Sequence, residues 1–579
     1  MPPRRPRAAS AKPTSTKETP AANTRAKPKS VAAAAATTTR KRVPSPERPA
    51  SPPAKRQRKT LQPADNVPQE TKKPTARAKA AREKAEDEPA PLKRGRQRTP
   101  APAKPPVAPR AKTPAKVVEK KPQTKAYLNP LPTPPPKQRP GLITFAWGAG
   151  NFGQFGMGPD ELGEIDKPRR NQWVEKGVSE GRFGEPGAGI ESIASGGLHS
   201  VFVDERGTVW TCGVNDDAAL GRVTQNVPNP EKPNEFLDVD ELASFPHPIQ
   251  TLVDEGFRTV KVVAGDSINA ALSDAGELRL WGSFRANEGS LGFSKALKHQ
   301  FHPVPVDIDL LSNPRVGDYE KVASVACGGN HIIALSTHGH IFTWGAGEQC
   351  QLGRKVLEGR KLDGTTPRKI TLGKRSNLAV LIGAGMYHSF AVTKEGDVWG
   401  WGLNTMGQTG TGHSGKQSDD EVLAPKPVIG LTKEDLGGAT VIKIVGGEHH
   451  TLFLTSDGRV FACGRSNVGQ LGLPDDHEAF KDRQDNDFVP EPVQVPMPDD
   501  EDDDPVVDIS CGPHSNMAIT QDGALYSWGQ GTQGELGVPD VEVRTPRTIV
   551  RREGGAWAAV AAAAGGQHTL GLFRKKPKD

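Results

Sequence analysis

The amino-acid sequence predicts an all-β fold: a seven-bladed β-propeller in which one blade is closed by both ends of the repeat region, preceded by a disordered basic tail. Three observations lead to this prediction. A Trp-Gly or Cys-Gly element recurs seven times, a second glycine-rich element falls between its copies, and the first 140 residues lack the apolar side chains that build a core. We therefore expect a tail over 1–140 and a propeller over 141–579.

The two repeated elements fix the number of blades. The second reads GGLHS, AGDSI, GGNHI, AGMYH, GGEHH, CGPHS and GGQHT in chain order, and copies of either element are 54 to 69 residues apart. Between them, β-rich runs flank turns that end at glycines such as Gly396 and Gly458, so each repeat holds about four short strands. Seven such units predict a propeller, which leaves only short, protected sheet edges. The Trp-Gly and Cys-Gly pairs begin at Trp147, Cys212, Trp281, Trp344, Trp401, Cys463 and Trp528.

The two ends of the repeat region predict how the propeller closes. The region begins with LITFAWG (142–148), the second half of a hairpin, and ends with GGQHTLGLF (565–573), the first half of one. Joined, they complete one blade. An open solenoid would need atypical capping repeats at both ends, and the sequence has none.

The tail and the repeats carry opposite charge. Residues 1–140 hold 35 Lys and Arg against 9 Asp and Glu, a net charge of +26, whereas the remaining residues have a net charge of −18. The tail has no Phe or Trp and a single tyrosine, Tyr127, so it buries too little apolar surface to offset its conformational entropy. Its charge indicates an arm that binds polyanions, although a tail that only keeps the protein soluble has the same composition.

Short motifs in the tail predict import and modification. The basic clusters within RKRVPSPERPASPPAKRQRK (40–59) are similar to a bipartite nuclear-import signal, which implies binding to import receptors. Ser-Pro and Thr-Pro pairs resemble proline-directed kinase sites, and Pro-Pro-Arg after Met1 resembles a signal for α-amino methylation. The import residues are Arg40, Lys41, Arg42, Lys55, Arg56, Arg58 and Lys59, and the modification sites are Pro2, Ser45, Ser51, Thr99 and Thr113.

Several classes of function are excluded. No 18-residue apolar stretch could span a membrane, and the N-terminus has no apolar segment behind its charges, as a secretory signal would. The five cysteines lack zinc-type spacing and suit a reducing compartment. HExxH, GxSxG and P-loop motifs are absent, so we expect no metal, no cofactor and no covalent chemistry. Five histidines share one repeat position, where the default role is blade-to-blade hydrogen bonding: His199, His331, His388, His450 and His568.

The repeats resemble the regulator-of-chromosome-condensation family over 142–573. Within that family, the third repeat, AGDSINAALSDAGELRLWGSFRANEG (264–289), is similar to the chromatin-bound guanine-nucleotide exchange factors for the small GTPase Ran. The resemblance implies a nuclear, monomeric protein that accelerates GDP release by stabilising the nucleotide-free GTPase. It also implies binding to nucleosomes, both histones and DNA, without sequence preference. The alternative is a propeller scaffold on chromatin that has no exchange activity.

One spacing supports the resemblance. In six repeats the glycine of the Trp/Cys-Gly pair is followed by another glycine eight residues later, but in the third repeat the two glycines, Gly282 and Gly292, are ten apart. The extra residues fall within Ser283–Leu291. Ordinary loop variation would explain them, whereas the resemblance implies a wedge that is pushed against the GTPase near its nucleotide.

The resemblance also assigns individual residues. Two positions depart from the family pattern, because Asn330 replaces an acidic residue and Ile268 replaces a histidine. The basic pair Lys374 and Arg375 stands where the family has a turn that binds nucleosomes. The implied GTPase-facing residues are Asp266, Arg285, Ala286, Asn287, Glu288, Gly289, Ser290, Asn330, either His449 or His450, and His568.

Overall fold

The structure, a computed structural model, describes residues 126–577 apart from 309–311, 314–317, 482, 484–486 and 499–503. The predicted import signal and all five predicted modification sites therefore lie outside the described residues. Among the described helices, none is long and apolar enough to cross a membrane.

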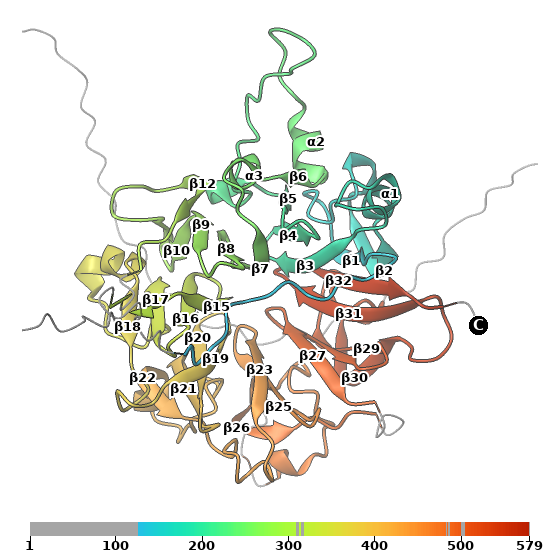
Figure 1. The fold of residues 1–579 in the computed structure, drawn as a ribbon. Coiled ribbons are helices and arrows are strands. Elements are labelled where there is room, and N and C mark those ends of the chain that lie inside the picture. Colours follow the sequence, from blue (N-terminus) through green and yellow to red (C-terminus); the bar gives the residue numbers. More distant parts are fainter. Residues whose placement is uncertain are drawn as a thin grey trace, which may run out of the picture. The chain divides into compact units, whose positions relative to one another are not determined.

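Within the described residues, strand pairing gives seven four-stranded antiparallel units around a common centre (Figure 1). Two neighbouring units share one parallel bridge, between Ala384 and Val445, and so form a single eight-stranded sheet. This arrangement is the predicted propeller, and each unit is one blade. From the centre outward the blades are β3 (Ile190–Ser195), β4 (His199–Asp204), β5 (Val209–Gly213) and β6 (His247–Pro248); β7 (Thr259–Ala264), β8 (Ile268–Ser273), β9 (Leu278–Gly282) and β12 (Gln300–Pro305); β15 (Val322–Cys327), β16 (His331–Ser336), β17 (Ile341–Gly345) and β18 (Arg368–Ile370); β19 (Ala379–Ala384), β20 (His388–Thr393), β21 (Val398–Leu403) and β22 (Glu421–Pro427); β23 (Val441–Gly446), β24 (His450–Thr455), β25 (Val460–Arg465) and β26 (Phe488–Gln494); β27 (Val506–Cys511), β28 (Ser515–Thr520), β29 (Leu525–Gln530) and β30 (Glu542–Val550); and β31 (Trp557–Ala564), β32 (His568–Lys575), β1 (Ile143–Ala149) and β2 (Glu164–Arg170).

The remaining elements lie in the connections between these strands. Two short ribbons pair β10 (Phe284–Ala286) with β11 (Gly289–Gly292) and β13 (Ser312–Asn313) with β14 (Asp318–Tyr319). The helix α1 begins after Asn171, whose side chain accepts the Val174 N–H, and ends at Gly181, which is left-handed at φ 74°. The helices are α1 (Gln172–Glu180), α2 (Val239–Ser244) and α3 (Gln250–Asp254), with 3₁₀ turns η1 (Pro159–Glu161), η2 (Asp216–Ala218), η3 (Glu358–Thr365), η4 (Gln417–Asp419) and η5 (Glu478–Phe480).

The core lies between neighbouring blades. The second strand of a blade is covered on both faces, so a strand such as β24, HTLFLT, is buried throughout, whereas the outer strand β22 is mostly exposed. The tryptophans of five repeats are fully buried, and Cys212 and Cys463 fill the same position in the other two as small apolar groups. The repeated Trp/Cys-Gly element is therefore a packing element.

Both ends of the repeat region build one blade, as predicted. Strand β1 pairs with β32 from Ile143 opposite Phe573 to Gly148 opposite His568, and β2 and β31 complete the sheet. The propeller is thus closed by backbone hydrogen bonds between residues more than 400 positions apart in the chain.

The last 15 residues of the predicted tail, 126–140, are described by the structure. Residues 126–140, the blue segment that crosses the front of Figure 1, lie on the propeller. The Asn129 side chain is buried and donates to the carbonyls of Ser336 (2.9 Å) and Ala379 (3.0 Å). At the other end of the segment, Arg139 forms an ion pair with Glu205, a nearly buried carboxylate. We call residues 126–140 the strap. These polar contacts attach the strap to the propeller, although the strap has too few aromatic side chains to form a core.

Candidate functional site

The Gly-Gly-x-His elements form a ring of turns at one end of the central channel. Each turn joins the innermost strand of a blade to the second strand, and backbone hydrogen bonds link six of the seven neighbouring pairs of turns in the described residues. Glycine is required where these turns meet: a Cβ on Gly265 would lie 2.6 Å from the Gly328 and Gly329 carbonyl oxygens. Among these bonds are Asp266 N–H to Gly329 O (2.7 Å), Met386 N–H to Gly447 O (2.9 Å) and Gly566 N–H to Gly196 O (3.0 Å).

The five repeat histidines connect blades, which confirms their predicted default role. Each ring Nε2 lies 2.7–2.9 Å from a polar side chain of the next blade. Burial lowers the pKa of His331 and of His568 to about 3 and that of His450 to about 4, so these rings are neutral at pH 7. The partners of His199, His331, His388, His450 and His568 are Asn269, Ser389, Thr451, Asn516 and Ser200.

Two of the residues that the resemblance places toward the GTPase are therefore buried in this structure. The side chains of His450 and His568 are 1% and 0% exposed and are already paired across a blade junction, so the part that these side chains show here is structural. His449, the other alternative in GGEHH, is about one-fifth exposed on the ring of turns. Its ring lies 3.7 Å from Glu448, which also lies 3.4 Å from His514.

Six of the seven blade junctions in the described residues share a second feature. A carbonyl in the loop after the third strand accepts two donors from the next blade. The Gln351 carbonyl, for example, accepts the Ser389 hydroxyl (2.8 Å) and the Trp401 indole N–H (2.9 Å). The six carbonyls belong to Gln154, Ala219, Gln351, Gln408, Gln470 and Glu535.

The seventh junction is where the third repeat is two residues longer. The loop there is the β10–β11 hairpin, and the residue in the place of Ser389 is Ile332, which has no side-chain donor. The histidine position of the same junction is Ile268. Both isoleucines are fully buried in one apolar cluster. The departure at Ile268 is thus a local repacking that accompanies the hairpin.

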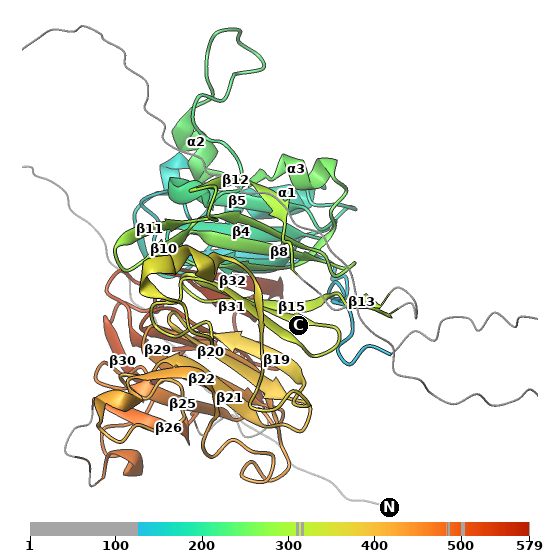
Figure 2. The ribbon, with the colours of Figure 1, turned by 90° about the vertical axis from the view of Figure 1, so that its left-hand side faces the viewer.

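The inserted residues form an exposed hairpin on the same face as the ring of turns. Arg285 pairs with Ser290 and Ala286 with Gly289, while Phe284 is fully buried and anchors the base. Arg285, Asn287, Glu288 and Ser290 are exposed. Figure 2 shows the hairpin on the left side of the propeller and the strap on the right, so the two lie on opposite faces. We call residues Phe284–Gly292 the wedge hairpin.

The structure brings three of the predicted residues together at the wedge hairpin. The Arg285 guanidinium lies 3.4 Å from the Asp266 carboxylate, and the Arg285 backbone N–H donates to Asn330 Oδ1 (2.8 Å). Asn330 therefore binds the hairpin of this chain, and a neutral acceptor suffices for a backbone N–H. A second carboxylate, Asp217, lies 3.8 Å from Arg285.

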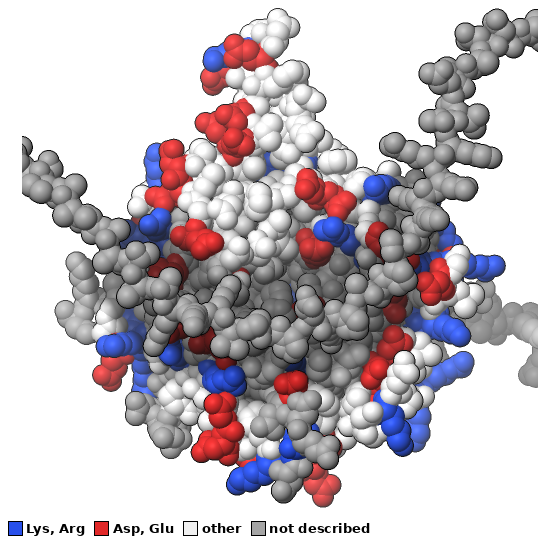
Figure 3. Space-filling model, turned by 180° about the vertical axis from the view of Figure 1, so that it is seen from behind, with Lys and Arg blue, Asp and Glu red and all other residues white. Residues whose placement is uncertain are grey.

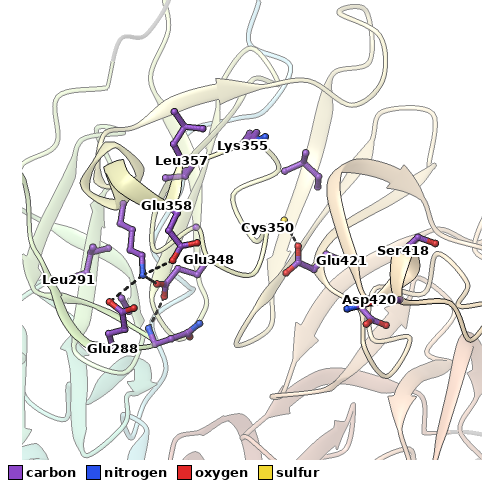
Figure 4. Close-up of a pocket in the computed structure, with 17 residues that line it drawn as sticks. Glu288, Leu291, Glu348, Cys350, Lys355, Leu357, Glu358, Ser418, Asp420 and Glu421 are labelled. Atoms are coloured by element: carbon purple, nitrogen blue, oxygen red, sulfur yellow. Dashed lines mark hydrogen bonds and ion pairs between the residues drawn. The ribbon is translucent and has the colours of Figure 1, made fainter.

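Sequence reasoning missed the residues on the other side of the hairpin. The Asn287 N–H donates to Glu348 Oε2 (2.7 Å), and Lys361 lies 2.6 Å from the same carboxylate. Both belong to the connection between β17 and β18: Glu348 lies within the repeated Trp-Gly element at 344–353, at a position that varies between repeats, and Lys361 lies beyond the repeated element. These residues and the hairpin line a cavity of about 780 Å³ (Figure 4).

Lys374 and Arg375 lie elsewhere. They are exposed in the connection between β18 and β19, close to Ala379, the residue to which the strap is bound. They therefore lie on the strap face, opposite the wedge hairpin. The wedge face carries mixed charge around its rim, with acidic side chains along the segment that leads into α2 (Figure 3). Among the described residues, no group of three or more His, Cys, Asp and Glu side chains could hold a metal ion.

The family model of the RCC1-like domain matches residues 143–571. The chain belongs to this family. It is 34% identical over 423 residues to the guanine nucleotide exchange factor SRM1 of Saccharomyces cerevisiae, an alignment that covers 70% of this chain and 82% of that protein. The RCC1-like match spans the seven blades that the repeats predicted.

Two solved structures are similar to the whole propeller. Prp20p of Saccharomyces cerevisiae, described with its binding to Gsp1p and histones, is 30% identical, covers 78% of this chain and 94% of its own, and superposes with a TM-score of 0.64. Yeast RCC1 (Prp20) bound to Kap60 is 30% identical, covers 81% of this chain and 97% of its own, and has a TM-score of 0.65.

Proposed function

We propose that this chain is a guanine-nucleotide exchange factor for a small GTPase of the Ran type. Family membership and its similarity to an exchange factor support the proposal. The observation that carries it is the wedge hairpin, which projects from a rigid propeller at the single blade where the repeat spacing lengthens. The reaction is exchange: the factor makes and breaks no covalent bond.

The physical basis is a difference in affinity. A factor that binds the nucleotide-free GTPase more tightly than the loaded one must weaken nucleotide binding by the same ratio, because the two equilibria are linked. The bound nucleotide is held largely through its phosphates and Mg²⁺. A hairpin that enters this region and carries Arg285 beside Asp266 would compete with those contacts. His449 would add a contact from the ring of turns.

The structure also bears on the alternative of a scaffold without exchange activity. That alternative arose from the departures at Ile268 and Asn330. Ile268 packs against a second isoleucine, and Asn330 accepts a hydrogen bond from the wedge hairpin. Both departures are therefore compatible with a functional hairpin, which supports exchange over the scaffold.

The second half of the proposal concerns location. Prp20p was described with histones and yeast RCC1 with Kap60, which supports chromatin and import receptors as partners of this chain. The basic tail would bind nucleosomal DNA without sequence preference, and Lys374 and Arg375 would bind histones. Since these residues lie on the face opposite the wedge hairpin, a nucleosome and the GTPase could be bound together. We expect a nuclear protein.

The deciding experiment is a nucleotide-release assay with the full chain and Ran loaded with fluorescent GDP. We expect release to be accelerated at least about a hundredfold over buffer, a barrier reduction of about 2.7 kcal/mol. The double substitution Lys374→Glu/Arg375→Glu should leave the rate of GDP release from Ran in solution unchanged, and it should weaken nucleosome binding. Release at the buffer rate by a folded full chain would leave the scaffold as the function.

A further inference from the structure

The outer edge of the wedge hairpin needs hydrogen-bond acceptors. Strand β10 pairs with β11 on one side only, and successive residues point their N–H groups to opposite sides. The N–H of Arg285 therefore points away from β11, and the N–H of Asn287, the first residue of the turn after β10, is also bound outside the ribbon. In a sheet they would bind a further strand, but here each is accepted by a side chain, Asn330 Oδ1 at 2.8 Å and Glu348 Oε2 at 2.7 Å.

Lys361 holds Glu348 in this position. Its amine lies 2.6 Å from Glu348 Oε1, and 3.4 and 3.5 Å from the carboxylates of Glu288 and Glu358. Figure 4 shows the three glutamates converging on one lysine amine beside the hairpin. Hydrogen bonding to Glu348 raises the pKa of Lys361 above its usual range. Glu348 and Lys361 are 15% and 21% exposed, whereas Glu288 and Glu358 are more than 80% exposed, so the Glu348–Lys361 pair is the ordered one.

A hairpin with this little sheet around it is not rigid by itself. Isolated two-stranded ribbons are marginally stable in water, and β10 and β11 contain three and four residues. A flexible hairpin would lose conformational entropy on binding the GTPase, which would cancel part of the binding free energy that drives exchange. The two side-chain acceptors remove that cost in advance.

We propose that Glu348 and Lys361 are positioning residues for nucleotide exchange: they hold the wedge hairpin in the conformation that engages the GTPase, without touching the nucleotide. The inference rests on the proposed function and extends it to residues outside the hairpin. It predicts that both residues act on the step in which nucleotide is expelled, rather than on the first encounter with the loaded GTPase.

The pair can be removed without disturbing the propeller. Both side chains come from the connection between β17 and β18, and neither belongs to an apolar core cluster. Lys355 offers a matched control, because it is exposed on the same cavity and comes from the same connection, but it makes no hydrogen bond or ion pair among the described residues.

The test compares the full-length variants Glu348→Ala, Lys361→Met, Lys361→Arg and Lys355→Met. Two quantities are measured: hydrogen–deuterium exchange of residues 285–290 in the free protein, and kcat and KM for GDP release from Ran. For Glu348→Ala and Lys361→Met we expect faster deuterium uptake at the hairpin, and a kcat about tenfold lower with KM changed less than about twofold. Lys361→Arg should restore both quantities, and Lys355→Met should match the wild type.

Three outcomes would overturn the inference: unchanged uptake at 285–290, faster uptake with a wild-type kcat, or an equal loss in Lys355→Met. The proposed function fails separately. A wild-type chain that releases no GDP would end both the exchange proposal and this role in it, while the deuterium measurement would still decide whether Glu348 and Lys361 hold the hairpin.

Discussion

Six blade junctions of this propeller are built alike and one is not, and the difference separates the residues that maintain the fold from those that we propose to act on a partner. At an ordinary junction a loop carbonyl such as Gln351 O accepts two buried donors from the next blade. At the exceptional junction the loop has become the wedge hairpin, and Ile268 and Ile332 seal the interface. The hairpin gains freedom to project outward because the next blade no longer needs its carbonyl.

The largest expected effect comes from shortening the loop at the exceptional junction to the length found in the other repeats. Removing Asn287 and Glu288 restores the eight-residue spacing of the other repeats. We expect GDP release to fall by more than about tenfold while the urea midpoint of unfolding stays unchanged, because an exposed turn contributes little to stability. The measurements are the release assay and urea unfolding. A wild-type release rate in a folded variant would reduce the insertion to ordinary loop variation.

The second prediction concerns the residue that faces the loop carbonyl, which is a serine at an ordinary junction and an isoleucine at the exceptional one. Ile332→Ser places a hydroxyl among apolar side chains and leaves a cavity, so we expect a loss of about 3–5 kcal/mol in the free energy of unfolding. Ser389→Ala at an ordinary junction removes the partner of His331 and should cost about 1–3 kcal/mol. Equilibrium unfolding measures both. Equal stability of Ile332→Ser and the wild type would show that the exceptional junction tolerates the ordinary donor.

The third prediction concerns pH. In the folded chain burial lowers the pKa of His331 and His568 to about 3 and that of His450 to about 4, against about 6.5 when unfolded. The unfolded chain therefore binds more protons between pH 6.5 and pH 4, so stability is full above pH 6.5 and falls with pH through this window. At pH 5.5 each of these histidines should account for a loss of about 1.4 kcal/mol.

The pH dependence also distinguishes the junctions. The exceptional junction has Ile268 in place of the histidine and should contribute nothing to it. Unfolding measured from pH 7.5 to 5 should show a shallower slope for His331→Gln than for the wild type, and the same slope for Ile268→Val. A wild-type slope in His331→Gln would contradict the assignment of the pH dependence to these junctions.

The same comparison explains what the sequence could predict. The blade number, the closing blade and the inter-blade histidines follow from features that recur seven times or nearly so, and the structure confirms them. The individual GTPase-facing residues follow from resemblance alone and stay predictions. For two of them, His450 and His568, the shared repeat position already implied the burial that the structure shows. Glu348 lies within a repeated element but at a position whose residue type varies between repeats, and Lys361 lies beyond the repeated element, so no shared residue marks either of them.

The strap shows a further limit of composition. The tail and the strap have similar Pro-rich sequences, and because both have few aromatic residues we predicted one disordered segment for the two. The strap lies on the propeller because single polar side chains reach backbone carbonyls there, as Asn129 does. Such contacts depend on where two loops lie in space, and a composition does not contain that information.

The smallest predicted effect tests the strap itself. Asn129 is 6% exposed, and its amide donates to Ser336 O at the end of β16 and to Ala379 O at the start of β19. These two strands belong to neighbouring blades. Replacing it with alanine would leave two buried acceptors without this donor, so we expect Asn129→Ala in the full chain to lower the free energy of unfolding by about 1–2 kcal/mol. The control is Lys137→Ala on the same strap. Its side chain is 56% exposed and its amine lies 3.6 and 3.7 Å from two carboxylates, so solvent screens these ion pairs and we expect almost no change. If the two variants unfold at the same urea concentration as the wild type, the strap is not part of the cooperative unit, and the folded body begins at 141 as the composition predicted.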